Sequence, residues 1–340
     1  MTAGEPILIW GAGAIGGILG AYAARAGHPV QMVDIEADHV QAMRRDGLRI
    51  EGPVEEFAQI LPAETPATLT GTYRRVILAV KAHHTRQAML MLMPHLAQDG
   101  FVVSAQNGLN ERVIAEMIGA HRTVGCFVNF GADWLAPGRI LYGNRAAVAL
   151  GELDGRISPR VREMHALFAL VEPEAVVTNN IWGYLWGKMG YGALLFATAL
   201  TPESMSDAMD PAQWRPVYAA LGHEVMRLAQ AEGVTPLGFN GFDPDAFLTR
   251  DTARMDASID AMVAHNRKTA KTHSGIYRDL AIRKRKTEVD AQVGVLIEIG
   301  RGHGILTPAL SELCNLIHGI ENGTRTQSTA LLDRMVAICS

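Results

Sequence analysis

The residues with the clearest chemical potential form a glycine-rich run near the start of the chain. A short uncharged apolar stretch, 6–10, leads into Gly-x-Gly-x-x-Gly, and residues 15–25 that follow are rich in Ala and Leu. This pattern predicts a buried strand, a tight turn and a helix that ends at Gly27. The run consists of Gly11, Ala12, Gly13, Ala14, Ile15 and Gly16. The N–H groups at such a helix start can bind a phosphate.

The spacing of the glycines and of the next acid indicates a dinucleotide site. Gly11 permits the turn, Gly13 lets a pyrophosphate approach the backbone, and Gly16 lets the helix pack on the strand. The second apolar stretch ends at Asp34, 18 residues after Gly16. A carboxylate there accepts hydrogen bonds from the adenosine ribose hydroxyls. The alternative is a packed strand–helix turn with a surface Asp and no ligand. We predict dinucleotide binding.

Composition excludes several other classes of protein. The chain has 340 residues, of which 48% are hydrophobic and 19% charged, so it can form two domains with ample cores. The net charge of −4 gives no reason to expect a nucleic acid or a membrane as partner. Cys126, Cys314 and Cys339 are scattered, with no zinc spacing and no disulfide framework. The N-terminal segment lacks a basic signal region. We expect a cytoplasmic protein with a small-molecule substrate and no metal.

The first part of the chain, 1–178, alternates strands and helices. Further strands are predicted at 75–82, 101–105 and 123–130, and this alternation is typical of a doubly wound parallel sheet. Ligands of such sheets bind at the carboxyl ends of the strands. Lys81 and Asn107 stand at two of these ends, on the side of the glycine turn. For either residue the alternative is a loop polar group with satisfied hydrogen bonds. Additional strands at 139–142 and 146–150 are expected at the sheet edge.

The sequence of the second part, 179–340, predicts a helical domain. No convincing strand follows residue 181, and helical periodicity covers 182–200, 216–232, 243–264, 288–303 and 308–322. Lys188 stands in an apolar helix, where it either extends to solvent or is partly desolvated and able to protonate a carbonyl oxygen. Thr287 is expected to cap the helix at 288–303, with Asp290 completing a capping box. Glu288, at this helix start, could be structural.

Together these motifs resemble the ketopantoate reductase (2-dehydropantoate 2-reductase) family. The matching pieces, in the family's order, are Gly11 to Gly16, Val80-Lys81-Ala82, Gln106-Asn107-Gly108, Trp186-Gly187-Lys188, Ser274 with Asp279, and Thr287-Glu288-Val289-Asp290. The resemblance spans most of the chain. It implies an α/β fold, a Rossmann-type doubly wound parallel sheet followed by an all-helical C-terminal domain like that of 6-phosphogluconate dehydrogenase. A homodimer through the helical domain would be compatible with it.

The resemblance also implies roles for individual residues. The family reduces a 2-keto acid by hydride transfer from a nicotinamide cofactor, so the protein supplies orientation and one proton donor. Lys188 would protonate the carbonyl oxygen, and Glu288 would hold the substrate hydroxyl or orient the lysine. Ser274 would bind the polar end of the substrate. Asn107 and Lys81 would line the nicotinamide side, with Asn107 near the substrate as well.

Two positions depart from the family pattern. The family's helix carries Asn four and eight residues after the lysine, where this chain has Gly192 and Phe196. Positions at this spacing share a helix face, so both should lie above Lys188 and contact the substrate. One extra residue before Glu288 leaves the placement of Ser274 open. We predict a substrate other than ketopantoate. The alternatives are 2-dehydropantoate 2-reductase itself and a non-catalytic dinucleotide sensor, although retention of Lys188 and Glu288 disfavours the sensor.

The residues after the second strand predict the cofactor. Asp34, Glu36 and Asp38 are acidic, and no Lys or Arg appears before Arg44. A carboxylate would repel the 2′-phosphate of NADP(H), which carries about −1.5 to −2 charge, the usual value for a phosphomonoester. We therefore expect NAD(H) to be favoured over NADP(H). Arg44 or Arg45 reaching back to the site is the main way in which NADPH could still be accepted.

Overall fold

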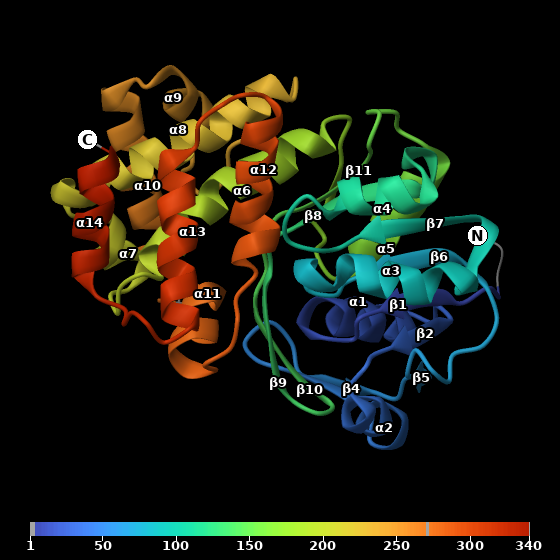
Figure 1. The fold of residues 1–340 in the computed structure, drawn as a ribbon. Helices are drawn as coiled ribbons and strands as arrows, with labels where there is room; N and C mark the ends of the chain where they lie inside the picture. Colours follow the sequence, from blue (N-terminus) through green and yellow to red (C-terminus); the bar gives the residue numbers. More distant parts are fainter. Residues whose placement is uncertain (1–3, 270–271, 340) are drawn as a thin grey trace. The chain divides into compact units, whose positions relative to one another are not determined.

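The computed structural model describes residues 4–269 and 272–339. The chain divides into two compact units, and the first ends at Ile181. Blue-to-green ribbon in Figure 1 is the first unit, and yellow-to-red ribbon is the second. The expected fold class, a Rossmann-type α/β domain followed by a helical domain, is confirmed.

The first unit is built on an eight-stranded sheet in the order β12-β11-β8-β7-β6-β1-β2-β5. The strands are β1 (Ile7–Trp10), β2 (Val30–Val33), β5 (Ala63–Glu64), β6 (Tyr73–Leu78), β7 (Leu96–Ser104), β8 (Thr123–Val128), β11 (Val148–Glu152) and β12 (Val176–Val177). From β1 the chain first winds outward through β2 and then returns to the other side through β6, β7 and β8. The point where the strand order reverses therefore lies beside β1, where such folds bind ligands.

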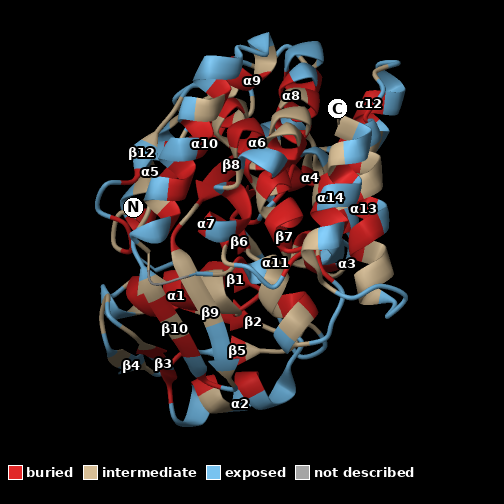
Figure 2. Ribbon diagram, turned by 90° about the vertical axis from the view of Figure 1, so that its left-hand side faces the viewer, coloured by how far each residue is buried: buried red, intermediate tan, exposed pale blue. Residues whose placement is uncertain are grey.

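Helices cover both faces of this sheet, because side chains on successive strand residues point to opposite sides. Ile7 and Ile9 belong to one hydrophobic core and Leu8 and Trp10 to the other. The first core includes residues of α1 (Ala14–Arg25), α2 (Ala37–Arg45) and α5 (Pro159–Phe168), and the second includes residues of α3 (Thr85–Leu92) and α4 (Asn110–Ile118). Figure 2 shows β1 and α1 mainly in the colour of buried residues.

The two strands expected at the sheet edge are placed differently. The predicted strand at 139–142 lies in β10 of a separate four-stranded sheet, because Ile140 and Tyr142 pack into the core that includes α1. That sheet consists of β3 (Leu48–Glu51), β4 (Phe57–Gln59), β9 (Gly131–Ala136) and β10 (Arg139–Asn144). The predicted strand at 146–150 lies in β11, between β8 and β12, and runs antiparallel to β8. The placement of 139–142 in the main sheet was therefore wrong, whereas 146–150 does contribute a strand of that sheet, one position in from its edge.

The second unit is helical, as expected, and the sheets contain no strand from its described residues. Its α-helices are α6 (Ile181–Thr198), α7 (Met205–Met209), α8 (Arg215–Ala231), α9 (Pro244–Thr249), α10 (Thr252–Arg267), α11 (Gly275–Tyr277), α12 (Val295–Gly302), α13 (Pro308–Glu321) and α14 (Thr329–Cys339). The unit also contains the 3₁₀ helix η4 (Ala212–Trp214) and two π-helical segments, η5 (Arg278–Ile282) and η6 (Asp290–Gly294). The predicted helix at 243–264 is split, because Arg250 adopts a left-handed conformation and Asp251 caps a new helix.

The predicted capping box before α12 is only half formed. The Thr287 hydroxyl accepts a hydrogen bond from the Val289 N–H at 3.2 Å. Asp290 instead pairs with His318 on α13, at 2.9 Å from its Nε2. The segment from Asp290 to Gly294 is π-helical rather than α-helical.

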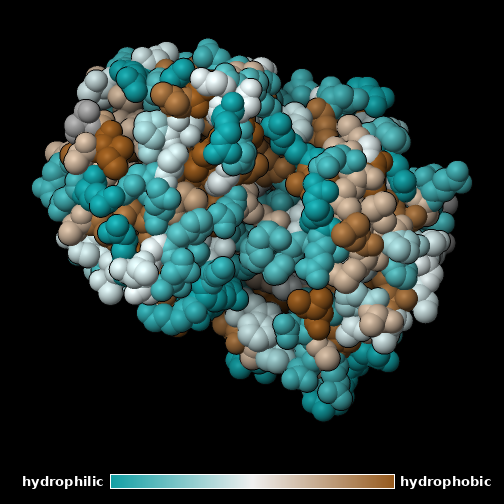
Figure 3. All heavy atoms as spheres, in the orientation of Figure 1, coloured by the Kyte–Doolittle hydropathy of each residue, from teal (hydrophilic) through white to brown (hydrophobic). Residues whose placement is uncertain are grey.

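The described helices are all too short or too polar to cross a lipid bilayer. The face of the molecule in Figure 3 is mainly hydrophilic, with hydrophobic residues in small separate patches.

Candidate active site

The glycine turn is closely packed on one side and open on the other. Gly11 has a φ of 96°, and a Cβ there would lie 2.9 Å from backbone atoms of Ala79 and Val80. A Cβ on Gly16 would lie 2.0 Å from the Gly11 carbonyl oxygen and 3.0 Å from Ile9 Cγ2 of β1, so the helix packs against the strand too closely for any side chain here. A Cβ on Gly13 would meet nothing within 4 Å. Gly13 starts α1 without a side-chain cap, and this helix end fits a pyrophosphate group.

Asp34 is hydrogen-bonded to the turn. Its Oδ2 accepts the Ala12 N–H at 2.9 Å, and its Oδ1 accepts the Glu36 N–H at 3.0 Å. The half-buried carboxylate is thereby held at the carboxyl end of β2, next to the glycine turn. The sequence predicted the residue but not this bond.

His39 supports the same turn from the other side and was missed by the sequence reasoning. Its Nε2 lies 2.8 Å from the Ala12 carbonyl oxygen, and the Gly138 N–H donates to its Nδ1 at 2.8 Å. Since Nδ1 accepts a hydrogen bond, Nε2 is the ring nitrogen that can donate to the Ala12 carbonyl oxygen. The buried imidazole thus connects the turn to the β9–β10 hairpin. Its position on the helix face that carries Met43 was the signal available in the sequence.

The two arginines that could reach back to Asp34 have acidic partners. Arg44 lies 3.6 Å from Glu64, and Arg45 lies 2.6 Å from Asp46. All four side chains are substantially exposed, so these ion pairs contribute little stability. They do, however, place a carboxylate beside each positive charge.

Lys81 and Asn107 follow adjacent parallel strands. β6 ends at Leu78, four residues before the predicted end at residue 82, and Lys81 precedes the short helix η1 (Ala82–His84). Asn107 follows β7, which pairs with β6 in parallel. Because β6 is also parallel to β1, both residues stand at the same edge of the sheet as the glycine turn. Lys81 is half-buried, and Asn107 is exposed.

A buried hydrogen-bond network connects the loops that carry Lys81 and Asn107. Gln106 Nε2 donates to the Val80 carbonyl oxygen and to the Thr85 hydroxyl, both at 2.8 Å. Thr85 in turn donates to Asn110 Oδ1 at 2.8 Å, and Asn110 Nδ2 donates to the Asn107 carbonyl oxygen at 2.6 Å. The sequence reasoning missed Thr85 and Asn110, which are identified only by these contacts.

In the second unit, one face of α6 carries Lys188. Most positions of this helix are buried. Of its half-buried residues, Tyr184, Lys188, Gly192 and Leu195 have a spacing that places them on one face, whereas Trp182 lies off that face. Phe196 is 1% exposed and packs in the interior. The structure therefore brings Gly192 to the side of Lys188 but not Phe196, and Leu195 takes the position expected for Phe196.

Gly192 faces the segment that carries Glu288. A Cβ on Gly192 would lie 3.9 Å from Gln292 Oε1 and would meet no other atom within 4 Å. Gln292 is one turn after Glu288, and its N–H donates to the Glu288 carbonyl oxygen at 2.9 Å. Both side chains are half-buried. Gln292 is thus a further site candidate, and its spacing from Glu288 was the signal that could have revealed it.

Ser274 has a structural contact that the sequence reasoning did not foresee. It is 3% exposed, and its hydroxyl oxygen accepts the Tyr277 N–H at 3.2 Å as the N-cap of α11. Asp279, the other half of this motif, pairs with Arg283 at 3.1 Å and with Arg285 at 2.8 Å.

These features define a class of protein. A strand, a glycine turn and a helix at the reversal point of a doubly wound sheet, followed by a helical unit with a half-buried lysine, form a two-domain dinucleotide-dependent dehydrogenase. Residues 7–155 match the family described as ketopantoate reductase PanE/ApbA, and residues 180–321 match its C-terminal domain. The chain belongs to the ketopantoate reductase PanE/ApbA family.

Individual relatives agree with this assignment. A 2-dehydropantoate 2-reductase of Mesorhizobium japonicum is 28% identical over 344 residues, covering 93% of this chain and 98% of that protein. D-mandelate dehydrogenase, solved with NADH and anilino(oxo)acetate, shares the fold with a TM-score of 0.81 at 20% identity, over 94% of this chain and 99% of that one. The PanE/ApbA family ketopantoate reductase from Ralstonia eutropha JMP134 has a TM-score of 0.78 at 24% identity, over 95% of this chain and 100% of that one. The chain is an NAD(P)-dependent oxidoreductase of the 2-hydroxy-acid class, acting on CH–OH and C=O groups.

Proposed function

We propose that this enzyme interconverts a 2-keto acid and a 2-hydroxy acid with NAD(H), and that its substrate is not ketopantoate. The observation that carries the proposal is the face of α6 beside Lys188, where Gly192 and Leu195 offer no polar side chain. In the family pattern, two amide side chains on this face would be available to bind the hydroxyl group of ketopantoate. This chain lacks both of them. Buried polar groups left unpaired are costly, so such a substrate is disfavoured.

The chain's own residues have simple tasks in this reaction. The N-terminus of α1 would hold the pyrophosphate, and Asp34 would accept hydrogen bonds from the ribose. The cofactor supplies or accepts the hydride. Lys188 donates a proton to the carbonyl oxygen during reduction and accepts it in the reverse direction. Its ammonium group also stabilises the developing negative charge, an effect that is stronger for a partly desolvated group.

The same face supports an apolar or aromatic substituent on the keto acid. Tyr184 and Leu195 flank Lys188 and Gly192, and their side chains are half-buried. D-mandelate dehydrogenase, a fold relative, was solved with anilino(oxo)acetate, an aromatic oxamate whose carbonyl and carboxylate groups are arranged as in a 2-keto acid. This likeness supports the substrate class, and Gly192 leaves room for a bulky group.

The preference for NAD(H) is supported by the charges around Asp34. Asp34 lies at the glycine turn, and Arg44 and Arg45 have Glu64 and Asp46 beside them. The 2′-phosphate of NADP(H) would meet net negative charge there. Like charges about 4 Å apart repel by about 4 kcal/mol at an effective dielectric constant near 20, and a fraction of that gives a tenfold preference.

The relative from Mesorhizobium japonicum favours a second candidate, 2-dehydropantoate 2-reductase. A substrate panel separates the two: ketopantoate, 2-ketoisovalerate and phenylglyoxylate, each with NADH and with NADPH. We expect the highest kcat/KM for phenylglyoxylate with NADH. Ketopantoate with NADPH as the best pair would overturn the proposal, and no turnover with any pair would support the non-catalytic sensor.

The proposals of a homodimer and of a cytoplasmic location rest on the family resemblance and on the scattered cysteines. Light scattering on the purified protein measures its molar mass and so tests the homodimer. A molar mass of one chain at micromolar concentration would contradict it.

A further inference from the structure

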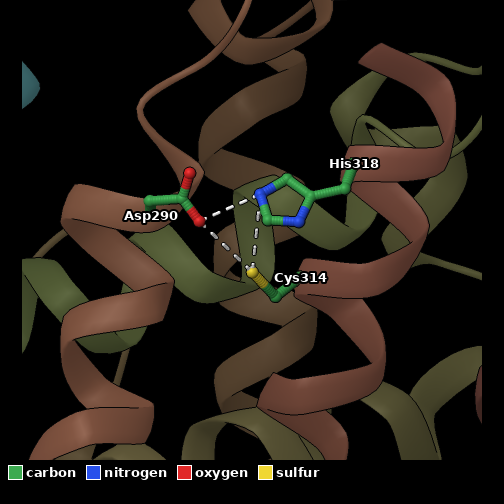
Figure 4. A group of neighbouring side chains, drawn as sticks. All are labelled: Asp290, Cys314 and His318. Carbon is green, nitrogen blue, oxygen red and sulfur yellow. Dashed lines mark hydrogen bonds and ion pairs between the residues drawn. The ribbon is translucent and has the colours of Figure 1, made fainter. Parts of the chain in front are cut away.

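Three side chains that could bind a metal converge in the helical unit. Asp290 lies in η6, and Cys314 and His318 lie one turn apart on α13 (Figure 4). Asp290 Oδ1 is 2.9 Å from His318 Nε2 and 3.9 Å from Cys314 Sγ, and Sγ is 4.0 Å from Nε2. In Figure 4 all three side chains point toward one another. The sequence reasoning expected no metal, because the three cysteines are scattered along the chain without the spacing of a zinc site.

The geometry fits an ion better than it fits a nucleophilic triad. In a triad the two ring nitrogens of the histidine contact different partners, one the nucleophile and the other the acid. Here the same nitrogen, Nε2, faces both Asp290 and Cys314. The triangle of donor atoms is small enough for an ion about 2.0–2.3 Å from each, the range of zinc–ligand bonds.

The donor set and its surroundings favour a divalent transition metal. Thiolate, imidazole and carboxylate are the three ligand types of protein zinc sites. Cys314 is buried, whereas the side chains of His318 and Asp290 are 38% and 77% exposed. An ion can therefore enter from solvent, and water can complete its coordination.

Two carboxylates lie near the Cys314 thiol. Burial, followed by the negative charges of Asp290 and Glu321, raises the pKa of Cys314 to about 11. The Glu321 carboxylate stands on the same helix and accepts hydrogen bonds from the N–H and hydroxyl of Thr287, both at 2.7 Å. A divalent cation would be attracted by these carboxylates and would stabilise the thiolate.

We propose that Asp290, Cys314 and His318 form a binding site for Zn²⁺. The ion would connect α13 to η6, the segment that follows Glu288. This proposal does not depend on the substrate or cofactor of the enzyme. Because a metal that binds only the folded chain stabilises it, Zn²⁺ should raise the melting temperature of the full-length protein.

The test uses Co²⁺ as a spectroscopic probe of the chelator-treated full-length protein. We expect one Co²⁺ per chain, displaced by Zn²⁺, with the near-ultraviolet absorption of a sulfur–cobalt bond. Cys314→Ser should abolish this absorption, whereas Cys339→Ser, which changes a half-buried thiol on α14, should leave it unchanged. His318→Gln should weaken Co²⁺ binding at least about tenfold.

His303→Gln is the matched control for the histidine, because His303 Nε2 also contacts a carboxylate, that of Glu232 at 2.6 Å. It should bind Co²⁺ like the unmodified protein. Circular dichroism checks that each variant is folded. The proposal is overturned if the unmodified protein shows no sulfur–cobalt absorption, or if that absorption persists in Cys314→Ser. Equal affinities of His318→Gln and His303→Gln would overturn it as well.

Discussion

The carboxylate of Asp34 accepts a hydrogen bond from the Ala12 N–H at 2.9 Å, so the acid at the end of the second strand also holds the glycine turn. Removing its side chain would disturb the turn and the charge together. Replacing it with Asn removes the charge and retains one oxygen, which can accept the Ala12 N–H while the Glu36 N–H loses its acceptor. The charge of Asp34 can therefore be removed while its hydrogen bond to the glycine turn is kept.

Asp34→Asn should shift the cofactor preference toward NADPH. The unmodified protein should bind NADH at least about tenfold more tightly than NADPH, because the carboxylate repels the 2′-phosphate. In the variant this ratio should fall about tenfold. Fluorescence titration with both reduced cofactors gives the two Kd values.

Arg44→Gln is the control for this measurement, since Arg44 is paired with Glu64 at 3.6 Å. It should leave the ratio of the two Kd values within about twofold of the original. Tighter binding of NADPH than of NADH by the unmodified protein would refute the prediction.

Lys188→Ala should lower kcat by about 10²–10⁴-fold, the usual effect of losing a general acid, with little change in the Kd for NADH. Steady-state kinetics and cofactor titration measure the two quantities. Lys286→Ala removes an exposed lysine of the same unit and should have near-normal kcat. A Lys188→Ala variant with near-normal kcat would show that another group donates the proton.

Gly192→Asn should raise kcat/KM for ketopantoate relative to the best substrate of the unmodified enzyme. The new Cβ would meet only Gln292 Oε1, at 3.9 Å, so the substitution fits and adds an amide beside Lys188. Leu195→Asn adds an amide on the same face and should act in the same direction. Unchanged relative kcat/KM values in both variants would contradict the assigned face.

Phe196→Asn should mainly destabilise the protein. The side chain is 1% exposed, so the change leaves a cavity and buries an amide. A loss of about 3–5 kcal/mol in the free energy of unfolding is expected, as for other large aromatic truncations in cores. Urea unfolding of this variant beside Gly192→Asn measures the difference, and equal stability of the two would place Phe196 outside the core.

Thr85→Val should break the network between the loops of Lys81 and Asn107. Valine has a similar shape but cannot accept the Gln106 amide or donate to Asn110, which are both buried. We expect a loss of about 1–3 kcal/mol in the free energy of unfolding. Thr85→Ser retains the hydroxyl, so its free energy of unfolding should be close to that of the unmodified protein. Equal stability of Thr85→Val and the unmodified protein in urea would show that the network is not stabilising.

Local patterns were sufficient for most of the fold. Apolar runs and breaker residues gave the central strands and the long helices, because each depends on residues close in the chain. The errors arose where distant segments decide the outcome. Residues 139–142 have an ordinary strand pattern, but Ile140 and Tyr142 pack beside α1, and this packing assigns them to the second sheet.

Some residues of the candidate site could likewise be identified from the sequence, whereas the contacts between them could not. The glycine run, Asp34 and Lys188 were identifiable because residue type and spacing define their chemistry. The bonds from His39 and Asp34 to Ala12 join residues more than 20 positions apart, and no local signal specifies such contacts. Only the packing of α6 distinguishes Leu195 from Phe196, since a helix turns about 100° per residue and neighbours point in different directions. Residue types indicate which chemistry is available, whereas the folded chain determines which groups meet.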